Sequence, residues 1–141
     1  VRNLINGKYK GDLYAVNPKE TEVQGLKCYS SVSEIPQTDL AIISIPAQAC
    51  LETITILAQE KGVKAFVMYT AGFGEETTEG GILEQKIVEV ISQANASLIG
   101  PNCIGILNRY HHSLFTLPIP EMDPFGIDMI SSSGGTARFI M

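Results

Sequence analysis

Short apolar runs that each stop at a turn-forming cluster organise this chain of 141 residues. The runs are rich in valine, isoleucine and leucine and are bounded by glycine, proline or polar residues, which is typical of strands buried on both faces. They cover residues 12–16, 39–45, 64–70, 97–99 and 127–131. Successive stops lie about one strand and one helix apart, so the pattern predicts a parallel sheet with crossover helices.

Two amphipathic helices are predicted between these strands. In the first, the apolar positions recur at helical spacing and Gly62 provides the stop. Its apolar stripe consists of Ala47, Cys50, Leu51, Ile54, Leu57 and Ala58. The second helix follows the third strand, and its stripe consists of Leu83, Ile87, Val90, Ile91 and Ala94. This second stripe is expected to pack on the sheet, and a shorter helix is expected at residues 33–35.

Both ends of the chain also show helical patterns. Residues 1–6 are typical of the last turns of a helix, with Gly7 placed as a left-handed cap. Residues 134–141 are typical of the first turns of another helix. Residues 110–125 hold three prolines and are expected to form an extended excursion before the last strand. Because a doubly wound sheet places a strand before its first helix, we expect the chain to be part of a longer protein.

Strands that alternate with helices in this way predict an α/β fold with a Rossmann-like, doubly wound parallel sheet. The expectation is one sheet with helices on both faces, truncated at its N-terminal strand and at the start of the next domain. In such a sheet the turns after the strands share one edge, where ligands bind, so five clusters distant in sequence are expected to line one crevice.

Charge and composition narrow the classes of partner. The net charge is −5 and no basic stretch is present, which argues against nucleic acid and membrane surfaces as partners. No apolar run reaches the length of a membrane span, and no signal peptide opens the chain. The three cysteines lie far apart and suggest neither a disulfide framework nor a metal site. We therefore expect a cytoplasmic protein that binds a small molecule or another protein.

The first cluster, Val16, Asn17, Pro18 and Lys19, stands where a NAD-binding Rossmann domain carries an acidic residue for the ribose hydroxyls. No acid is present there. The lysine instead suits a phosphorylated ribose, as in NADP or in the 3′-phosphate of coenzyme A. The alternative from this segment alone is a solvated lysine after a proline turn.

The second and third clusters follow the next two predicted strands. Ile45, Pro46 and Ala47 open a helix whose free N–H groups and small side chains leave room for a nucleotide, although a proline at a helix start needs no ligand. The third cluster consists of Thr70, Ala71, Gly72, Phe73 and Glu75. Its small residues permit close backbone approach, Phe73 offers a ring for stacking and Glu75 offers a carboxylate. Alternatively, Phe73 belongs to the core and Glu75 is a helix-start charge.

The fourth cluster is the most specific, because two glycines, a proline and an asparagine within residues 100–105 require an unusual backbone path. It contains Pro101, Asn102 and Cys103. We do not assign Cys103 as a nucleophile, since no Cys/His signature surrounds it, and His111 and His112 lack metal-ligand spacing. The fifth cluster contains Ser131, Ser133 and Gly134 at a helix start, which indicates either an anion site or an ordinary serine N-cap.

Together these clusters resemble the CoA-binding domain of the NDP-forming acyl-CoA synthetases, the family that includes ADP-forming acetyl-CoA synthetase and the alpha subunit of succinyl-CoA synthetase. Further matches lie at residues 25–29 and 61–65. The resemblance implies that residues 1–126 bind coenzyme A and acyl-CoA and that residues 127–141 begin a flavodoxin-type domain. It assigns contacts with coenzyme A to Val16, Asn17, Pro18, Lys19, Ile45, Pro46, Ala47, Thr70, Ala71, Gly72, Phe73, Glu75, Pro101, Asn102 and Cys103, and contacts with a phosphoryl group to Ser131, Ser133 and Gly134.

The resemblance also implies a reaction, in which acid, coenzyme A and NTP form acyl-CoA, NDP and phosphate through an acyl phosphate and a phosphohistidine. The histidine-bearing and ATP-grasp parts are expected in other domains or in another subunit, so neither His111 nor His112 takes that role. We assign no catalytic residue, expect this chain alone to be inactive and expect an oligomer. One alternative is a non-catalytic CoA-binding protein, which would usually lack the Ala-Gly-Phe and Gly-Pro-Asn-Cys motifs. The other is a dehydrogenase; the missing acid after Val16 opposes a NAD-dependent one, which leaves an NADP-dependent oxidoreductase as the less favoured alternative.

Overall fold

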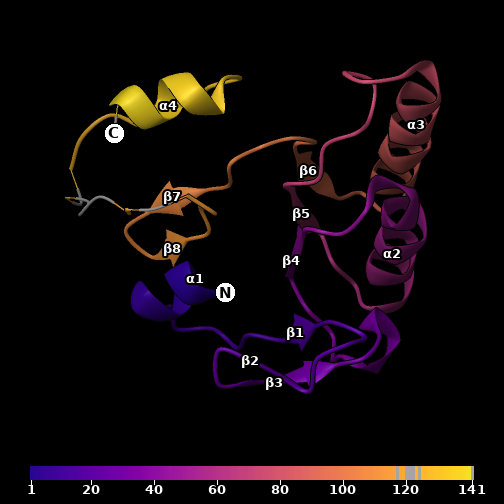
Figure 1. Ribbon diagram of the computed structural model, residues 1–141, viewed down its shortest axis with the longest axis horizontal. Coiled ribbons are helices and arrows are strands. Elements are labelled where there is room, and N and C mark those ends of the chain that lie inside the picture. Colours follow the sequence, from indigo (N-terminus) through magenta and orange to yellow (C-terminus); the bar gives the residue numbers. More distant parts are fainter. Residues whose placement is uncertain (117, 120–122, 124, 141) are drawn as a thin grey trace. The chain divides into compact units, whose positions relative to one another are not determined.

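The computed structural model describes residues 1–116, 118, 119, 123 and 125–140, which form two compact units (Figure 1). Unit 1 combines Val1–Gly11 with Ile104–Met141, and unit 2 is Asp12–Cys103. Four of the five sequence clusters therefore belong to unit 2, and the fifth belongs to unit 1.

Unit 2 contains a three-stranded parallel sheet in the order β4–β5–β6. β4 is Leu40–Ile43, β5 is Ala65–Met68 and β6 is Ser97–Ile99. In its register Ile43 pairs with Met68, and Val67 pairs with Ile99. Each strand lies inside one of the predicted runs, so the three strands and their parallel direction are confirmed.

The two predicted crossover helices are present as α2 (Ala47–Glu60) and α3 (Thr78–Gln93). α2 begins directly after Pro46, which has no N–H to leave unpaired at a helix start. Thr77 caps α3, because its hydroxyl oxygen accepts the N–H of Gly80 at 2.9 Å. The two helices contact each other on one side of the sheet (Figure 1).

The hydrophobic core of unit 2 contains side chains from these helices and from the sheet. Ile54 of α2, Phe66 of β5 and Ile87 of α3 are each at most 1% exposed. In the predicted stripe of α2, every residue except the half-buried Leu51 is buried. In the stripe of α3, Ile87 and Ile91 are buried, and Leu83, Val90 and Ala94 pack against the core from partly buried positions. The helical periodicity of the sequence therefore identified the buried faces correctly.

A second three-stranded sheet of unit 2 has the order β1–β3–β2. β1 (Ala15–Val16) runs parallel to β3 (Leu26–Tyr29), and β2 (Glu22–Val23) runs antiparallel to β3. Gln24 and Gly25 form the two-residue turn of the β2–β3 hairpin, with φ of 56° and 81°. Among the described residues of unit 2 the strands thus form two separate three-stranded sheets, where the sequence predicted one.

The short helix expected at residues 33–35 is a 3-10 helix, η1 (Val32–Glu34). Ser31 caps it, since the Ser31 hydroxyl oxygen accepts the N–H of Ser33 at 3.2 Å. Lys61, which follows α2, donates from Nζ to the Ser33 carbonyl oxygen at 2.6 Å. These contacts fasten the segment between the two sheets to the end of α2.

The described part of unit 1 contains two short helices and a two-stranded antiparallel sheet. The helices are α1 (Arg2–Asn6) and α4 (Gly134–Ile140), both as predicted. The strands are β7 (Leu107–Asn108) and β8 (His111–His112). β8 lies in the segment predicted as an extended excursion, of which residues 117, 120–122 and 124 lie outside the described residues.

The prediction of a left-handed cap at Gly7 is wrong. Its φ is −74°, and the positive φ belongs to the next residue, Lys8, at 53°. Glycine is needed at this position for close approach instead, because an added Cβ would collide with the ring of His112.

The prediction of a buried strand at residues 127–131 is also wrong. These residues form no strand, and Ile127 and Ile130 are 97% and 103% exposed. A buried parallel strand needs neighbours on both sides, and among the described residues no strand pairs with this run. The assignment of residues 127–141 to a following domain stays a prediction.

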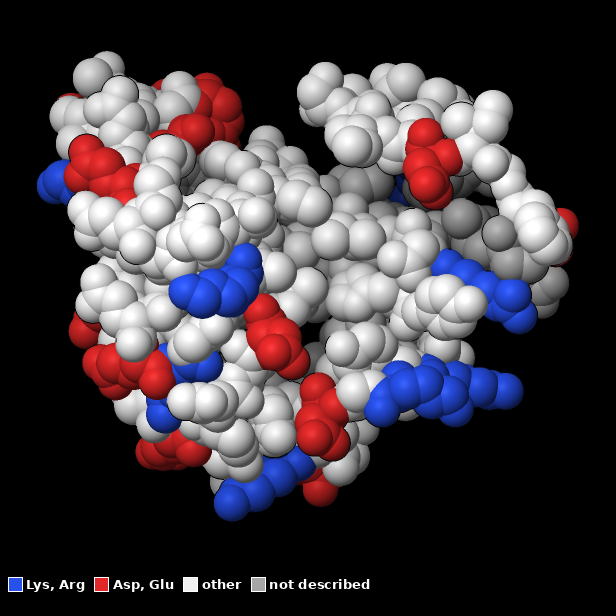
Figure 2. Space-filling model, turned by 180° about the vertical axis from the view of Figure 1, so that it is seen from behind, with Lys and Arg blue, Asp and Glu red and all other residues white. Residues whose placement is uncertain are grey.

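Charged side chains are dispersed over the surface. Figure 2 shows acidic and basic side chains interspersed on the face that it displays. Within the described ranges, no helix combines the length and the apolar character needed to cross a membrane.

We expect Ile54→Ala to lower the free energy of unfolding by about 2–5 kcal/mol, because it opens a cavity in the core between α2 and the sheet. The matched control is Ile82→Ala, the same change on α3 at a side chain that is 51% exposed, for which a loss below about 1 kcal/mol is expected. Urea unfolding followed by circular dichroism measures both. Equal losses in the two variants would contradict the core described above.

Candidate functional site

Three of the predicted clusters follow the carboxyl ends of neighbouring strands in unit 2. Ile45 to Ala47 follow β4, Thr70 to Glu75 follow β5, and Pro101 to Cys103 follow β6. Because the three strands are parallel and adjacent, their last residues lie along one edge of the sheet. We call these residues the carboxyl edge.

Thr70 links the three turns of the carboxyl edge. Its hydroxyl donates a hydrogen bond to the carbonyl oxygen of Ile45 at 2.8 Å and accepts one from the N–H of Ile45 at 3.3 Å. Its own carbonyl oxygen accepts the N–H of Asn102 at 2.9 Å. Thr70 alone thus holds the turn after β4 with its side chain and the turn after β6 with its backbone.

The turn after β6 follows the unusual backbone path that its sequence predicts. Gly100 has a φ of 110°, and an added Cβ would collide with the carbonyl oxygen of Met68. Asn102 has a φ of 52° and is exposed, and Cys103 donates its N–H to the same Met68 oxygen at 3.3 Å. Glycine and asparagine are the residues that adopt such positive φ angles at least cost. The turn therefore lies tightly against the end of β5.

The turn after β5 is closed by its own carboxylate. Glu75 accepts the N–H of Gly72 at 2.9 Å through one carboxylate oxygen and the N–H of Phe73 at 3.1 Å through the other. The hydrogen bond from Gly72 is the largest cause that lowers the pKa of Glu75, so the side chain stays ionised. Glu75 lies at the predicted edge, but its acceptor oxygens are engaged by the turn itself.

Phe73 belongs to the core. Its ring is fully buried, at 0% exposed, and packs in the same cluster as Phe66 and Ile87. The interpretation in which this ring stacks on a ligand is therefore wrong, and the alternative of a core residue is correct. The N–H of Phe73 is bound by the carboxylate of Glu75.

Cys50 lies beneath the edge and was not singled out from the sequence as a site residue. It is 0% exposed, and its Sγ lies 3.8 Å from the carbonyl oxygen of Ile45 and 3.6 Å from that of Pro46. Burial raises the pKa of the thiol, and a hydrogen bond with Thr70 partly opposes this rise. The thiol is therefore neutral, and its only sequence signal is its place in the apolar stripe of α2.

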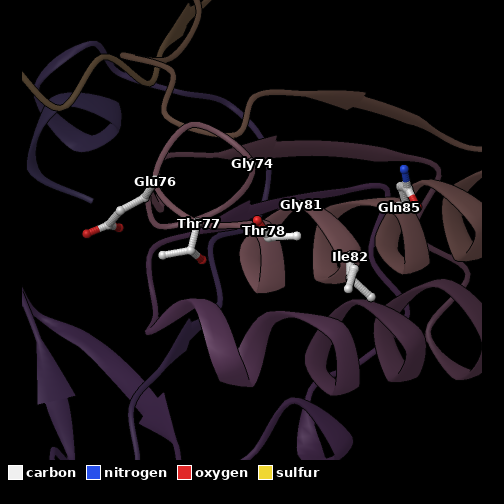
Figure 3. Close-up of a pocket in the computed structure, with 7 residues that line it drawn as sticks. All are labelled: Gly74, Glu76, Thr77, Thr78, Gly81, Ile82 and Gln85. Carbon is white, nitrogen blue, oxygen red and sulfur yellow. The ribbon is translucent and has the colours of Figure 1, made fainter.

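An open pocket of about 510 Å³ adjoins the turn after β5 at the start of α3 (Figure 3). Its lining residues are Gly74, Glu76, Thr77, Thr78, Gly81, Ile82 and Gln85. Figure 3 shows the Glu76 side chain directed away from Ile82 and Gln85. None of the residues assigned to the ligand lines this pocket, so the carboxyl edge and the pocket are neighbours rather than one site.

The first cluster lies on the other sheet of unit 2, after β1. Asn17 donates its N–H to the carbonyl oxygen of Tyr29 at 2.9 Å, and its side-chain Oδ1 accepts the N–H of Lys19 at 2.9 Å. This Asx turn fixes the backbone that carries Lys19. Pro18 and Lys19 are exposed, so the ammonium group is available to an anion in solution.

The fifth cluster belongs to unit 1, where it forms the start of α4. The Ser133 hydroxyl oxygen accepts the N–H of Thr136 at 3.2 Å, and the Ser131 hydroxyl donates to the Ser133 carbonyl oxygen at 2.9 Å. An added Cβ on Gly134 would lie 2.5 Å from Cγ2 of Ile104. The serine N-cap expected as one alternative is therefore present, and both serines are exposed.

A protein-family model described as "CoA binding domain" matches residues 1–109. The alpha subunit of the ADP-forming acetate–CoA ligase II of Pyrococcus furiosus is 45% identical over 132 residues, which are 93% of this chain and 28% of that protein. A trans-feruloyl-CoA synthase from an unknown prokaryotic organism is 38% identical, over 99% of this chain and 20% of that protein.

Among solved structures, the apo form of a dinucleotide-forming acetyl-coenzyme A synthetase 1 from Candidatus Korarchaeum cryptofilum matches with a TM-score of 0.73 and 35% identity. The match covers 81% of this chain and 25% of that one. The chain thus spans roughly a fifth to just over a quarter of the length of these proteins.

We expect Glu75→Gln to destabilise the protein at neutral pH, because an amide has one acceptor oxygen and no charge to offer the two N–H groups. The loss should be about 1 kcal/mol or less, because solvent screens this exposed side chain. Since the pKa of Glu75 is lowered by folding, its contribution is present above the ordinary pKa of a glutamate and is lost as the pH falls through the folded value. The difference in free energy of unfolding between wild type and variant should therefore shrink on acidification.

Urea unfolding at neutral and at acidic pH measures this difference. The control is Glu89→Gln, the same change at an exposed carboxylate on α3, and it should change the free energy of unfolding at neutral pH by less than about 0.5 kcal/mol. A constant gap between wild type and Glu75→Gln across the pH range would contradict the hydrogen-bonded turn.

Proposed function

The chain belongs to the family of CoA binding domains, and from this membership we propose that it is the part of an ADP-forming acyl-CoA synthetase that holds coenzyme A. The match of the family model to residues 1–109 carries the proposal. The 45% identity to a subunit of an ADP-forming acetate–CoA ligase supports it. Coenzyme A is the ligand of this domain.

The proposed reaction joins an acid and coenzyme A at the expense of ATP and releases acyl-CoA, ADP and phosphate through an acyl phosphate and a phosphohistidine. In this proposal the present chain supplies the site for coenzyme A, and the histidine and nucleotide sites lie in other domains or in another subunit. We further propose that residues 127–141 begin the next domain, that the complete protein is an oligomer and that it works in the cytoplasm. The two ligases compared above take different acids, and we propose no particular acyl group.

We propose that coenzyme A lies along the turns of unit 2. The exposed ammonium of Lys19 pairs with the 3′-phosphate, because a point charge on a fixed turn suits a phosphate dianion. The small residues Pro46, Ala71 and Gly72 let the uncharged arm approach the backbone of the carboxyl edge. The turn of Asn102 and Cys103 lies at the thiol end. The remaining assigned residues shape these turns.

A phosphoryl group is proposed as the ligand of Ser131, Ser133 and Gly134. Hydroxyl groups and a glycine at a helix start are suited to bind such a group, and both serines are exposed. In the synthetase proposal this group arrives on the histidine of another domain. A non-catalytic CoA-binding protein is the alternative, and the Ala-Gly-Phe and Gly-Pro-Asn-Cys motifs favour the synthetase.

Calorimetric titration of the intact protein tests the ligand. We expect binding of coenzyme A and weaker binding of NADP, because no nicotinamide site is part of the proposal. Lys19→Ala should weaken coenzyme A by up to about fivefold, the effect of one exposed ion pair, while leaving the affinity for 3′-dephospho-coenzyme A unchanged.

Lys86→Ala is the matched control, since it removes the same charge from an exposed position on α3. It should leave both affinities unchanged. Tighter binding of NADP than of coenzyme A would overturn the ligand assignment. If Lys19→Ala lost affinity for coenzyme A and for 3′-dephospho-coenzyme A equally, only the role of Lys19 would be overturned.

A further inference from the structure

The hydrogen bonds of the Thr70 side chain replace the backbone hydrogen bonds of the sheet at the point where β4 and β5 separate. The regular ladder reaches the N–H of Tyr69, which donates to the carbonyl oxygen of Ile43 at 2.9 Å. Beyond it, Ile45 presents its N–H and carbonyl groups to the hydroxyl of Thr70 instead of to a backbone partner. A side chain therefore completes the pairing just before the chain turns into α2.

The same hydroxyl is bound by the protein itself. It donates to the carbonyl oxygen of Ile45 and accepts the N–H of Ile45. A hydroxyl has one donor and two acceptor sites, so these two hydrogen bonds use its donor site and one of its acceptor sites. Thr70 thus has little left to offer a ligand through its side chain.

The backbone of Thr70 extends the link to the turn after β6. Its carbonyl oxygen accepts the N–H of Asn102, whose φ of 52° is set by this tight turn. A shift of Thr70 would therefore move the turn after β4 and the turn after β6 together. An extended ligand bound along the carboxyl edge has to match the distance between these two turns.

We propose that Thr70 is a positioning residue for coenzyme A, which acts by fixing the turns at Ile45 and Asn102 rather than by touching the ligand with its hydroxyl. The inference rests on the proposed function, because it takes the carboxyl edge as the place where coenzyme A lies. A turn held in its binding geometry before the ligand arrives saves the free energy of ordering it on binding, so the hydroxyl contributes to affinity without contact.

Thr70→Val tests the proposal, because valine keeps the branched shape and lacks the hydroxyl. Calorimetry on the intact protein should show coenzyme A bound about tenfold more weakly, the equivalent of one hydrogen bond. Thr55→Val is the matched control, since the hydroxyl of Thr55 donates to the Leu51 carbonyl oxygen at 2.7 Å inside α2, away from the edge. Its affinity for coenzyme A should stay within about twofold of wild type.

A second test compares Thr70→Ser with Thr70→Cys, two variants that differ in one atom. This comparison stays informative if Thr70→Val does not fold. Under reducing conditions, the serine variant should bind coenzyme A nearly as well as wild type, and the cysteine variant should bind about tenfold more weakly, because a thiol is a poor hydrogen-bonding substitute. A merely structural role would lower the unfolding temperature of both variants and leave their affinities alike.

The outcomes separate the two proposals. If the wild-type protein fails to bind coenzyme A, the proposed function and this inference both fall. If wild type binds and Thr70→Val, Thr70→Ser and Thr70→Cys bind equally well, the positioning role alone is overturned. Weak binding by Thr70→Val and Thr70→Cys, with near-native binding by Thr70→Ser and Thr55→Val, supports the inference.

Discussion

Strand ends inside a folded domain leave backbone N–H and carbonyl groups that need partners, and this requirement shapes the carboxyl edge of unit 2. The chain leaves β4 at Ile45 to begin α2, so the ladder to β5 cannot continue. The hydroxyl of Thr70 supplies both missing partners. Its carbonyl oxygen also accepts the N–H of Asn102, so hydrogen bonds at this one residue join the turn before α2 to the turn after β6.

Small residues allow the turns to lie closely against one another. A Cβ on Gly80, in the first turn of α3, would collide with the carbonyl oxygen of Phe73, and one on Gly100 would collide with that of Met68. Each glycine lets one element approach the backbone of another at the carboxyl end of β5. The core beneath, with Phe66, Phe73 and Ile87 fully or nearly fully buried, thereby lies close to the turns of the carboxyl edge.

Sequence periodicity was sufficient for the parts of the fold that bury a regular face. It located α2, α3 and the three strands between and beside them, because apolar side chains at spacings of helix and strand report burial directly. It failed at residues 127–131, where an apolar run has no strand beside it among the described residues. A run of valine and isoleucine shows only that a segment can be buried, and pairing depends on what lies next to it.

The turns after the strands were located from the sequence, but the contacts of their side chains were not. Phe73 lies in the core, Glu75 binds its own turn and the hydroxyl of Thr70 binds Ile45, although all three stand in motifs that were assigned to the ligand. Glycine and proline reveal where a chain turns, because their backbone preferences are local. Which polar atom meets which partner depends on the folded path of the chain, both within one turn, as for Glu75 and Gly72, and between residues 25 positions apart, as for Thr70 and Ile45.

The carboxylate of Glu75 also places a negative charge at one turn of the proposed binding surface. A negative group already held by two N–H donors of its own turn has little to offer a phosphate and repels it. Lys19, on the turn after β1, attracts the same group. Coenzyme A carries its phosphates at one end and an uncharged arm at the other, so in the proposed site the two turns favour one of the two ways in which it could lie along the surface. The thiol would then be oriented by charges that never touch it.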